Sequence, residues 1–143
     1  MFRSLAIALA AFLLAGCSTS AEVDNPFGGG GDGKTQMAAF AAQSQYPNRQ
    51  AEESQISAVV DRKEGRIKII NPTNQALTDA KVWVNGDFVT RVDSIPARGS
   101  MTLTRENFYD KKGIALSKST SPINRIQIET SDRFVNLLGP AYE

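Results

Sequence analysis

The sequence predicts an all-β fold: a small antiparallel β-sandwich of about seven short strands, formed by residues 55–143. Three observations lead to this fold class. Apolar and polar residues alternate from Gln55 onward, as in half-buried strands. Asn85-Gly86, between two such runs, is a strong hairpin signal. This part of the chain also has almost no helical periodicity, and two sheets packed face to face would bury its many alternating faces.

Residues 1–16 have the pattern of a secretory signal peptide. One basic residue, Arg3, precedes an apolar run that is too short to span a bilayer as a permanent helix. The run ends in Leu14, Ala15, Gly16 and Cys17, and Cys17 is the only cysteine of the chain. These four residues resemble the lipobox of bacterial lipoproteins. The alternative is an ordinary signal peptide followed by an incidental cysteine.

The lipoprotein resemblance implies a membrane anchor at Cys17. In that family the cysteine receives a diacylglycerol, the chain is cut just before it, and the new amino group is usually acylated as well. Two or more acyl chains are enough for stable attachment to a membrane. Ser18, rather than an aspartate, follows the cysteine. By the same resemblance this favours the outer membrane, on its periplasmic face, if the source has two membranes.

Residues 17–54 are predicted to be the lipidated cysteine and a flexible tether, because Ala, Gly, Gln, Asn and Ser dominate the segment. A flexible chain of this length would hold the domain roughly 30–40 Å from the anchor on average. A short helix over residues 36–45 is also compatible with the pattern, since Met37, Phe40 and Ala41 share one helical face. That helix would either dock on the domain or the membrane, or fluctuate with the tether.

The tether contains GGGGDGKT at residues 28–35, which fits the phosphate-binding pattern G-x-x-x-x-G-K-[ST]. A phosphate cradle needs a buried strand leading into the glycines and a helix leaving them. The upstream stretch SAEVDNPF is polar and interrupted by Pro26. We find no apolar strand ending in Asp that would hold Mg²⁺. We therefore expect a linker here, and no bound nucleotide.

The composition restricts the possible chemistry. The chain has no histidine, which excludes histidine-dependent triads and His-ligated zinc or iron. Lipidation of Cys17 would exclude thiolate sites as well. We expect no enzyme activity, no metal and no cofactor, because the remaining carboxylates are scattered over predicted turns and strand ends: Asp87, Asp93, Glu106, Asp110, Glu129 and Asp132.

The charge balance argues against nucleic acid as a partner. Cleavage after residue 16 would remove one basic residue, Arg3, from the 16 Lys and Arg and none of the 15 Asp and Glu. The mature side chains would then be electrically neutral, whereas nucleic acids and anionic headgroups attract basic surfaces.

The period of two predicts both the strands and the core. The predicted strands lie in QISAVVDR, GRIKIIN, AKVWVNG, DFVTRV, MTLTRE, INRIQIET and RFVNLLG, with Ser131-Asp132 as the turn between the last two. The inward-facing residues are expected to form the core: Ile67, Ile69, Val82, Val84, Leu103, Ile126, Ile128 and Leu137.

The stretch IKIINPTNQALTDAKVWVNGDFV, followed by SIPARGSMTL, resembles the immunoglobulin-like or fibronectin-type-III-like modules of bacterial envelope lipoproteins. The likeness covers about two thirds of the mature chain. It implies fold and setting rather than activity. The cysteine pair of antibody-type domains is missing, and Trp83 is out of phase with Val82 and Val84.

These features predict a lipid-anchored, non-catalytic interaction or structural module of the cell envelope. The alternative is a binding module for an envelope glycan, peptide or small ligand. Trp83 is the possible partner contact, because the period of two turns it away from Val82 and Val84. It would otherwise lie under the loop NPTNQALTD, or be turned into the core by a bulge.

Overall fold

The structure is a computed structural model that describes residues 22–24 and 31–142. The predicted signal peptide, the lipobox and Cys17 lie outside the described residues. The side chains of the sheet and helix are described from Gly33 to Leu137.

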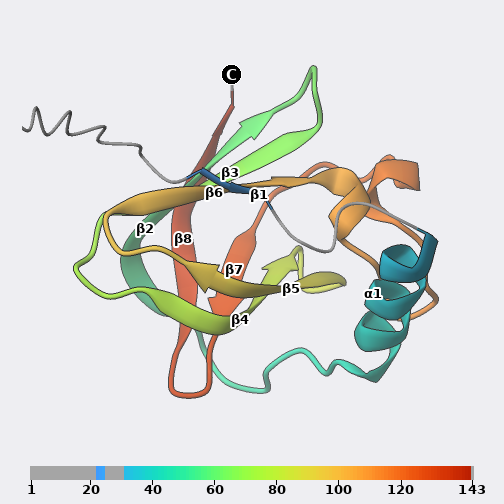
Figure 1. The fold of residues 1–143 in the computed structure, drawn as a ribbon, viewed down its shortest axis with the longest axis horizontal. Helices are drawn as coiled ribbons and strands as arrows, with labels where there is room; N and C mark the ends of the chain where they lie inside the picture. Colours follow the sequence, from blue (N-terminus) through green and yellow to red (C-terminus); the bar gives the residue numbers. More distant parts are fainter. Residues whose placement is uncertain (1–21, 25–30, 143) are drawn as a thin grey trace, which may run out of the picture.

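The described residues form eight strands and one α-helix (Figure 1). Two short 3₁₀ turns, η1 (Arg105–Asn107) and η2 (Leu116–Lys118), lie between β6 and β7. The elements are β1 (Glu22–Asp24), α1 (Gly31–Gln43), β2 (Glu52–Asp61), β3 (Arg66–Asn71), β4 (Leu77–Val84), β5 (Phe88–Ile95), β6 (Gly99–Thr104), β7 (Ile126–Glu129) and β8 (Phe134–Tyr142).

The seven predicted strands correspond to β2–β8, so the mostly β prediction is confirmed for these residues. The pairing differs from the prediction. The strands form one hydrogen-bonded sheet in the order β1-β6-β3-β2-β8-β7-β4-β5. Two of its pairs, β2 with β8 and β1 with β6, are parallel. The sheet curls until β5, at one edge, approaches β6 near the other edge (Figure 1). These residues therefore form a single mixed sheet, and not the predicted pair of antiparallel sheets.

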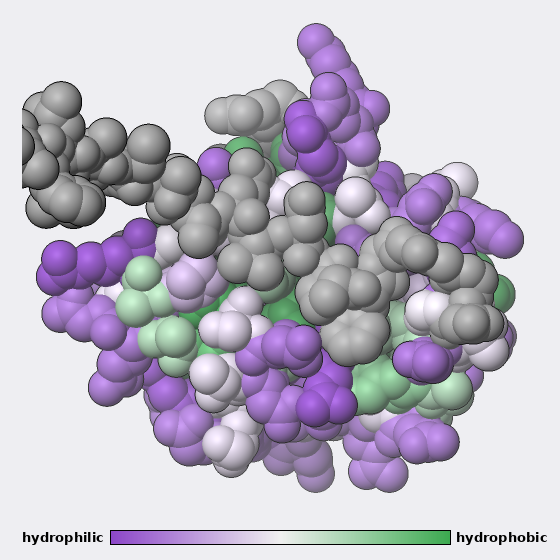
Figure 2. All heavy atoms as spheres, viewed as in Figure 1, coloured by the Kyte–Doolittle hydropathy of each residue, from purple (hydrophilic) through white to green (hydrophobic). Residues whose placement is uncertain are grey.

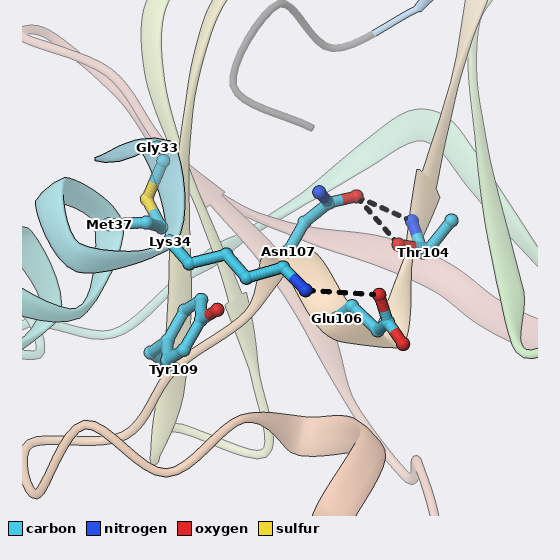
Figure 3. Close-up of a pocket in the computed structure, with 7 residues that line it drawn as sticks. All are labelled: Gly33, Lys34, Met37, Thr104, Glu106, Asn107 and Tyr109. Carbon is cyan, nitrogen blue, oxygen red and sulfur yellow. Dashed lines mark hydrogen bonds and ion pairs between the residues drawn. The ribbon is translucent and has the colours of Figure 1, made fainter. Parts of the chain in front are cut away.

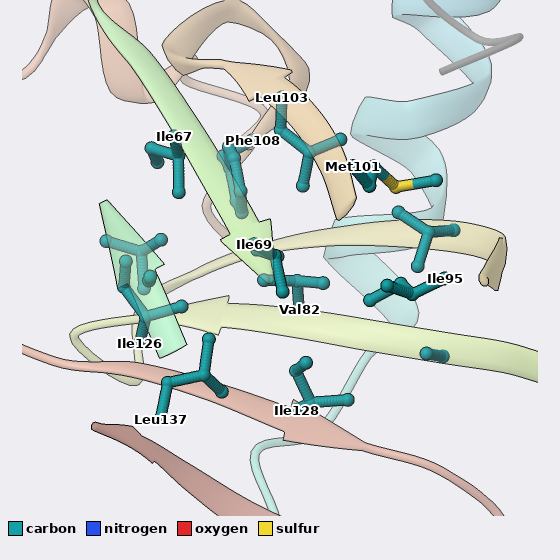
Figure 4. Close-up of a cluster of buried hydrophobic side chains, with 14 of the residues drawn as sticks. Ile67, Ile69, Val82, Ile95, Met101, Leu103, Phe108, Ile126, Ile128 and Leu137 are labelled. Atoms are coloured by element: carbon teal, nitrogen blue, oxygen red, sulfur yellow. The ribbon is translucent and has the colours of Figure 1, made fainter. Parts of the chain in front are cut away.

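The concave side of the curled sheet holds the main core (Figure 4). Apolar side chains from β2 to β8 meet there, together with Phe108 and Leu116 from the 3₁₀ region. The removal of a Val, Leu, Ile, Phe or Met side chain from water contributes about 1.5–3 kcal/mol to the stability of the fold. The eight residues predicted for the core are all buried: Ile67, Ile69, Val82, Val84, Leu103, Ile126, Ile128 and Leu137.

The predicted hairpin at Asn85-Gly86 joins β4 to β5. Asn85 has φ 56° and Gly86 has φ 83°, and two successive positive φ angles are what a type I′ turn needs. The Asp87 N–H closes the turn by donating to the Val84 carbonyl at 3.2 Å. The side chain of Asn85 also accepts from the backbone N–H of Asn124 at 2.9 Å, which holds the segment before β7 against the turn.

Candidate functional site

The convex face of the sheet carries a second apolar cluster, which α1 covers. We call this the outer cluster: Met37, Ala41, Trp83, Val89, Tyr109, Ala115 and Phe134, with Phe40, Tyr46 and Ala51 packed against it. The sequence TQMAAFAAQ favours a helix because Ala, Met and Gln are good helix formers. Met37, Phe40 and Ala41 lie on the face that meets the sheet, as their spacing predicts.

Parts of the segment predicted to be a flexible tether, residues 17–54, are therefore folded: β1 pairs with β6, and α1 packs on the sheet. The helix spans Gly31–Gln43 rather than residues 36–45, and its end is fixed by the Ser44 hydroxyl, which donates to the Phe40 carbonyl at 2.8 Å. Ser44 itself is buried. The following chain brings Tyr46 and Ala51 onto the outer cluster before β2 begins. This packing and strand β2, which begins at Glu52, extend across the predicted domain boundary at residue 55.

Trp83, the candidate partner contact, is only 2% exposed. Its direction was predicted correctly, because Val82 and Val84 face the main core while Trp83 faces the convex side. Its burial arises from neither predicted cause, which were the loop NPTNQALTD (residues 71–79) and a bulge. The helix and the chain after it cover the convex face at this point. Trp83 is thus a structural residue of the outer cluster.

Aromatic rings fix the position of Tyr46 over the sheet. Its ring meets that of Trp83 edge to face, with centroids 5.3 Å apart, and that of Phe134 at 5.6 Å in the same manner. Such pairs add about 0.5–1.5 kcal/mol beyond the area they bury. The guanidinium of Arg125 lies 5.8 Å from the Tyr46 ring centroid, within the range of a cation–π contact.

A row of polar side chains continues from Tyr46 across β7, β8 and β2. The Tyr46 hydroxyl donates to Gln127 Oε1 at 2.5 Å, and Gln127 Nε2 donates to Asn136 Oδ1 at 2.8 Å. Asn136 Nδ2 in turn donates to Glu53 Oε1 at 3.3 Å. Gln127 is almost fully buried, so these bonds satisfy a side chain that would be costly to leave unpaired. The row ties together three neighbouring strands and the segment after α1.

The phosphate-loop-like residues lie at the start of α1, beside a small pocket (Figure 3). The pocket lies between α1 and the end of β6 and has a volume of about 30 Å³, room for a water molecule or two. Lys34 Nζ lies 4.0 Å from Glu106 Oε2, and both side chains are largely exposed. Asn107 Oδ1 is occupied by the Thr104 N–H and hydroxyl. Gly28 lies outside the described residues, whereas Gly33, Lys34 and Thr35 are helical rather than part of a linker.

Several of the six carboxylates singled out from the sequence have structural partners. Asp110 Oδ1 accepts the N–H groups of Lys112 and Ile114, and Asp132 accepts the Thr130 hydroxyl. Glu106 faces Lys34, and Glu129 accepts the Trp83 indole N–H at 3.0 Å. Asp87 lies in the β4–β5 turn, and Asp93 is exposed on β5. Within the part of the chain that the structure describes, no three metal-ligating residues come together.

One carboxylate outside that set has a shifted pKa. Asp61 ends β2, and its Oδ1 accepts the backbone N–H groups of Glu64 at 3.0 Å and Lys63 at 2.8 Å. These bonds, that of Glu64 first, hold the pKa of Asp61 below its usual value, and Arg66 adds to the effect. Asp61 thereby organises the β2–β3 turn.

Comparisons with protein-family models, curated proteins and solved structures found no match to this chain. Over the described residues, no helix has the length and apolar character needed to cross a membrane.

Sequence reasoning missed Tyr46 and Glu129 as partners of Trp83. The only local signal for the helix that brings Tyr46 there was the spacing of Met37 and Ala41. Glu129 could be placed beside Trp83 only from the β4–β7 register, in which Lys81 pairs with Glu129 and Trp83 with Gln127.

Proposed function

We propose that this chain is a lipid-anchored, non-catalytic interaction or structural module of the bacterial cell envelope. The observation that carries the proposal is the lipobox Leu14-Ala15-Gly16-Cys17 at the end of a short apolar run, with Cys17 as the only cysteine. The acyl chains on Cys17 hold the protein to the membrane, on the periplasmic face of the outer membrane where the source has two membranes.

The use of polar groups within the domain supports a non-catalytic role. Glu129 lies between the Trp83 indole and Lys81, and its side chain is only 21% exposed. Asp61 and Asp110 accept backbone N–H groups in turns. These carboxylates are used to hold strands and turns in place, whereas a catalytic pair would converge on a shared cleft.

The likeness to immunoglobulin-like envelope modules stays a prediction within this proposal. It concerns the setting of the domain and the order of the strands β2–β8. The mixed, curled sheet supports a compact all-β module, in which an interaction surface would be presented by strand ends and turns.

Trp83 is the candidate contact for a partner of either kind, and the alternative, a binding module for glycan, peptide or small ligand, also needs exposed aromatic side chains on a sheet face. An aromatic platform for such a ligand has to be accessible. Trp83 is buried under α1. The Tyr46 ring packs edge to face against Trp83 and Phe134, and its hydroxyl donates a hydrogen bond to Gln127. The outer cluster thus supports a structural role for these residues and offers no aromatic platform to a ligand. The proposal of an interaction or structural module is carried by the lipobox and does not depend on Trp83.

The test compares the full chain with Cys17→Ser in a bacterial host that processes lipoproteins. We expect the parent protein to partition into detergent and its N-terminal peptide to begin with a Cys17 that carries added acyl mass. Cys17→Ser removes the thiol that receives the lipid, so it should leave the detergent phase and keep an unprocessed N-terminus. A Cys17→Ser protein that is cut at the same position and still fractionates with the membrane would contradict the lipoprotein proposal.

A further inference from the structure

Strand β1 brings the sheet close to the proposed anchor. Glu22, Val23 and Asp24 pair in parallel with Ser100, Met101 and Thr102 of β6. Cys17 and Glu22 are five residues apart, and an extended chain spans at most about 3.6 Å per residue. Their Cα atoms can therefore be no more than about 18 Å apart. The stretch from Cys17 to the first residue paired with β6 is thus much shorter than the predicted tether of residues 17–54.

The register defines which end of the sheet is nearest to Cys17. Glu22 is level with Ser100, and Ser100 pairs with Ile70 near the end of β3. Beyond this level lie two loops, residues 72–76 and 96–98, which share one end of the sheet (Figure 1, left). The β2–β3 turn, residues 62–65, lies at the other end of β3. It is separated from Ile70 by at least four residues of strand, or about 14 Å.

Asn71 joins the two loops into one rigid surface, which we call the Asn71 platform (residues 72–76 and 96–98). Asn71 is fully buried, and its Nδ2 donates to Gln75 O at 2.8 Å and Pro96 O at 3.1 Å. The backbone N–H of Arg98 donates to Thr73 O at 2.9 Å, and Arg98 Nε donates to Asn74 Oδ1 at 2.6 Å. The loops are thus fixed to each other and to the sheet.

Charge distinguishes the two ends of β3. Arg98 is the one charged residue of the Asn71 platform, which also contains two prolines and two alanines. Five of the six residues 61–66 are charged, and the tip of their hairpin is hydrophilic (Figure 2, top). Charged groups lose hydration when they approach a lipid surface, so the hairpin is better placed in bulk water.

We propose that the Asn71 platform faces the lipid bilayer surface, with the β2–β3 hairpin pointing away from it. The inference rests on the proposed lipid anchor at Cys17. The short chain between Cys17 and β1 holds this end of the sheet near the membrane. Because the platform carries only one charged residue, it loses little charge hydration when it approaches the lipid surface. The surface available to an envelope partner is then the hairpin end of the domain.

The test uses the lipidated full chain in phosphatidylcholine vesicles that contain some lipids with a nitroxide on the headgroup. A fluorophore is attached at Ala97→Cys on the platform or at Lys63→Cys in the hairpin, both exposed positions. Lipidation consumes the Cys17 thiol, so the introduced cysteine is the only reactive one. We expect several-fold stronger quenching at position 97 than at position 63, because headgroup nitroxides quench only nearby labels. Equal quenching, or stronger quenching at position 63, would overturn the orientation.

A variant with a disrupted β1 tests whether the pairing of β1 with β6 sets the orientation at the membrane. Val23→Pro places a proline, which lacks a backbone N–H, in the middle of β1 and should weaken the β1–β6 pair. The first held position then becomes Gly31, fourteen residues from Cys17, and the reach grows to about 50 Å. We expect the difference in quenching between positions 97 and 63 to shrink, and an unchanged difference would contradict the role of β1. Flotation of the labelled protein with the vesicles reports the anchor separately: failure to float overturns the proposed function, whereas flotation with the wrong quenching pattern overturns only the orientation.

Discussion

The indole N–H of Trp83 donates a hydrogen bond of 3.0 Å to Oε2 of Glu129, on the face of the sheet that α1 covers. Lys81 Nζ lies 3.6 Å from the same oxygen. The only tryptophan of the chain is thus held at its apolar ring by the outer cluster and at its polar edge by a neighbouring strand. Through these two sets of contacts, Trp83 joins the helix to the sheet.

Two substitutions of Trp83 should lower the free energy of unfolding by different amounts. Trp83→Ala empties a buried site and should lower the free energy of unfolding by about 3–5 kcal/mol. Trp83→Phe keeps much of the ring contact but removes the donor to Glu129, so it should cost less. Urea unfolding measures both. The parent protein should also show blue-shifted tryptophan emission that iodide quenches poorly. An unchanged free energy of unfolding in Trp83→Ala, or parent tryptophan emission like that of the unfolded chain, would contradict the burial of Trp83.

Two neighbouring alanines of α1 test whether the helix is docked. Ala41 is 1% exposed in the outer cluster, whereas Ala42 faces solvent. Ala41→Asp places an unpaired charge within the buried outer cluster and should lower the free energy of unfolding by about 3 kcal/mol. Ala42→Asp has the same helix propensity and nearly the same position relative to the helix dipole, so it should cost well under half of that. Equal effects in urea unfolding would mean that the helix is not packed as described.

A chain shortened to begin at Gln55 should be less stable than one that begins at Gly31. The sequence alone predicts that the shorter chain folds unaided, since the main core lies beyond that point. The structure predicts exposure of Trp83, Val89 and Phe134, together with loss of the first strand residues of β2. We expect a lower melting temperature, dye binding to exposed apolar surface, and red-shifted Trp83 emission. Identical melting and emission for the two chains would support the boundary at residue 55.

The strands were predictable because alternation is a local signal. Ile67 and Ile69, or Val82 and Val84, reveal their buried face without knowledge of their neighbours. The choice of neighbours is not local: β2 pairs in parallel with β8, so Glu52 lies beside Val135. Nothing in either segment specifies that partner, and a two-sheet arrangement would bury the same residues.

The fate of Trp83 shows the same limit. Its direction followed from the period of two, but its burial depends on a helix that lies about forty residues earlier in the chain. Among the helix side chains that the structure describes, from Gly33 to Gln43, only Met37 and Ala41 are buried apolar residues that meet the sheet. The amphipathic pattern is therefore weak, and Ala- and Gln-rich composition is typical of tethers as well as of helices.

Asn71 provides the last test, because its four hydrogen bonds require an amide. Nδ2 donates to the carbonyls of Gln75 and Pro96, while Oδ1 accepts from the N–H and the hydroxyl of Thr73. Asn71→Asp keeps the acceptor for Thr73 but turns a carboxylate oxygen toward two carbonyls at a site with no solvent exposure. We expect it to lower the free energy of unfolding by about 3 kcal/mol or more at neutral pH.

The pH dependence separates this mechanism from a simple packing defect. Burial next to carbonyl oxygens should raise the pKa of the introduced carboxyl above its unfolded value of about 3.9, because the charged form is disfavoured. When the pKa of the carboxyl is higher in the folded than in the unfolded variant, the neutral form stabilises the folded state. The stability of the variant relative to the parent is therefore greatest below the unfolded-state pKa, and it falls as the pH rises through the folded-state pKa. The gap between Asn71→Asp and the parent in urea unfolding should therefore narrow as the pH falls from 7 toward 4. Asn74→Asp is the matched control: it lies in the same loop, is exposed and accepts from Arg98, so it should stay near the parent throughout. A gap for Asn71→Asp that is small at pH 7, or independent of pH, would show that Asn71 does not hold the two loops together in the way described.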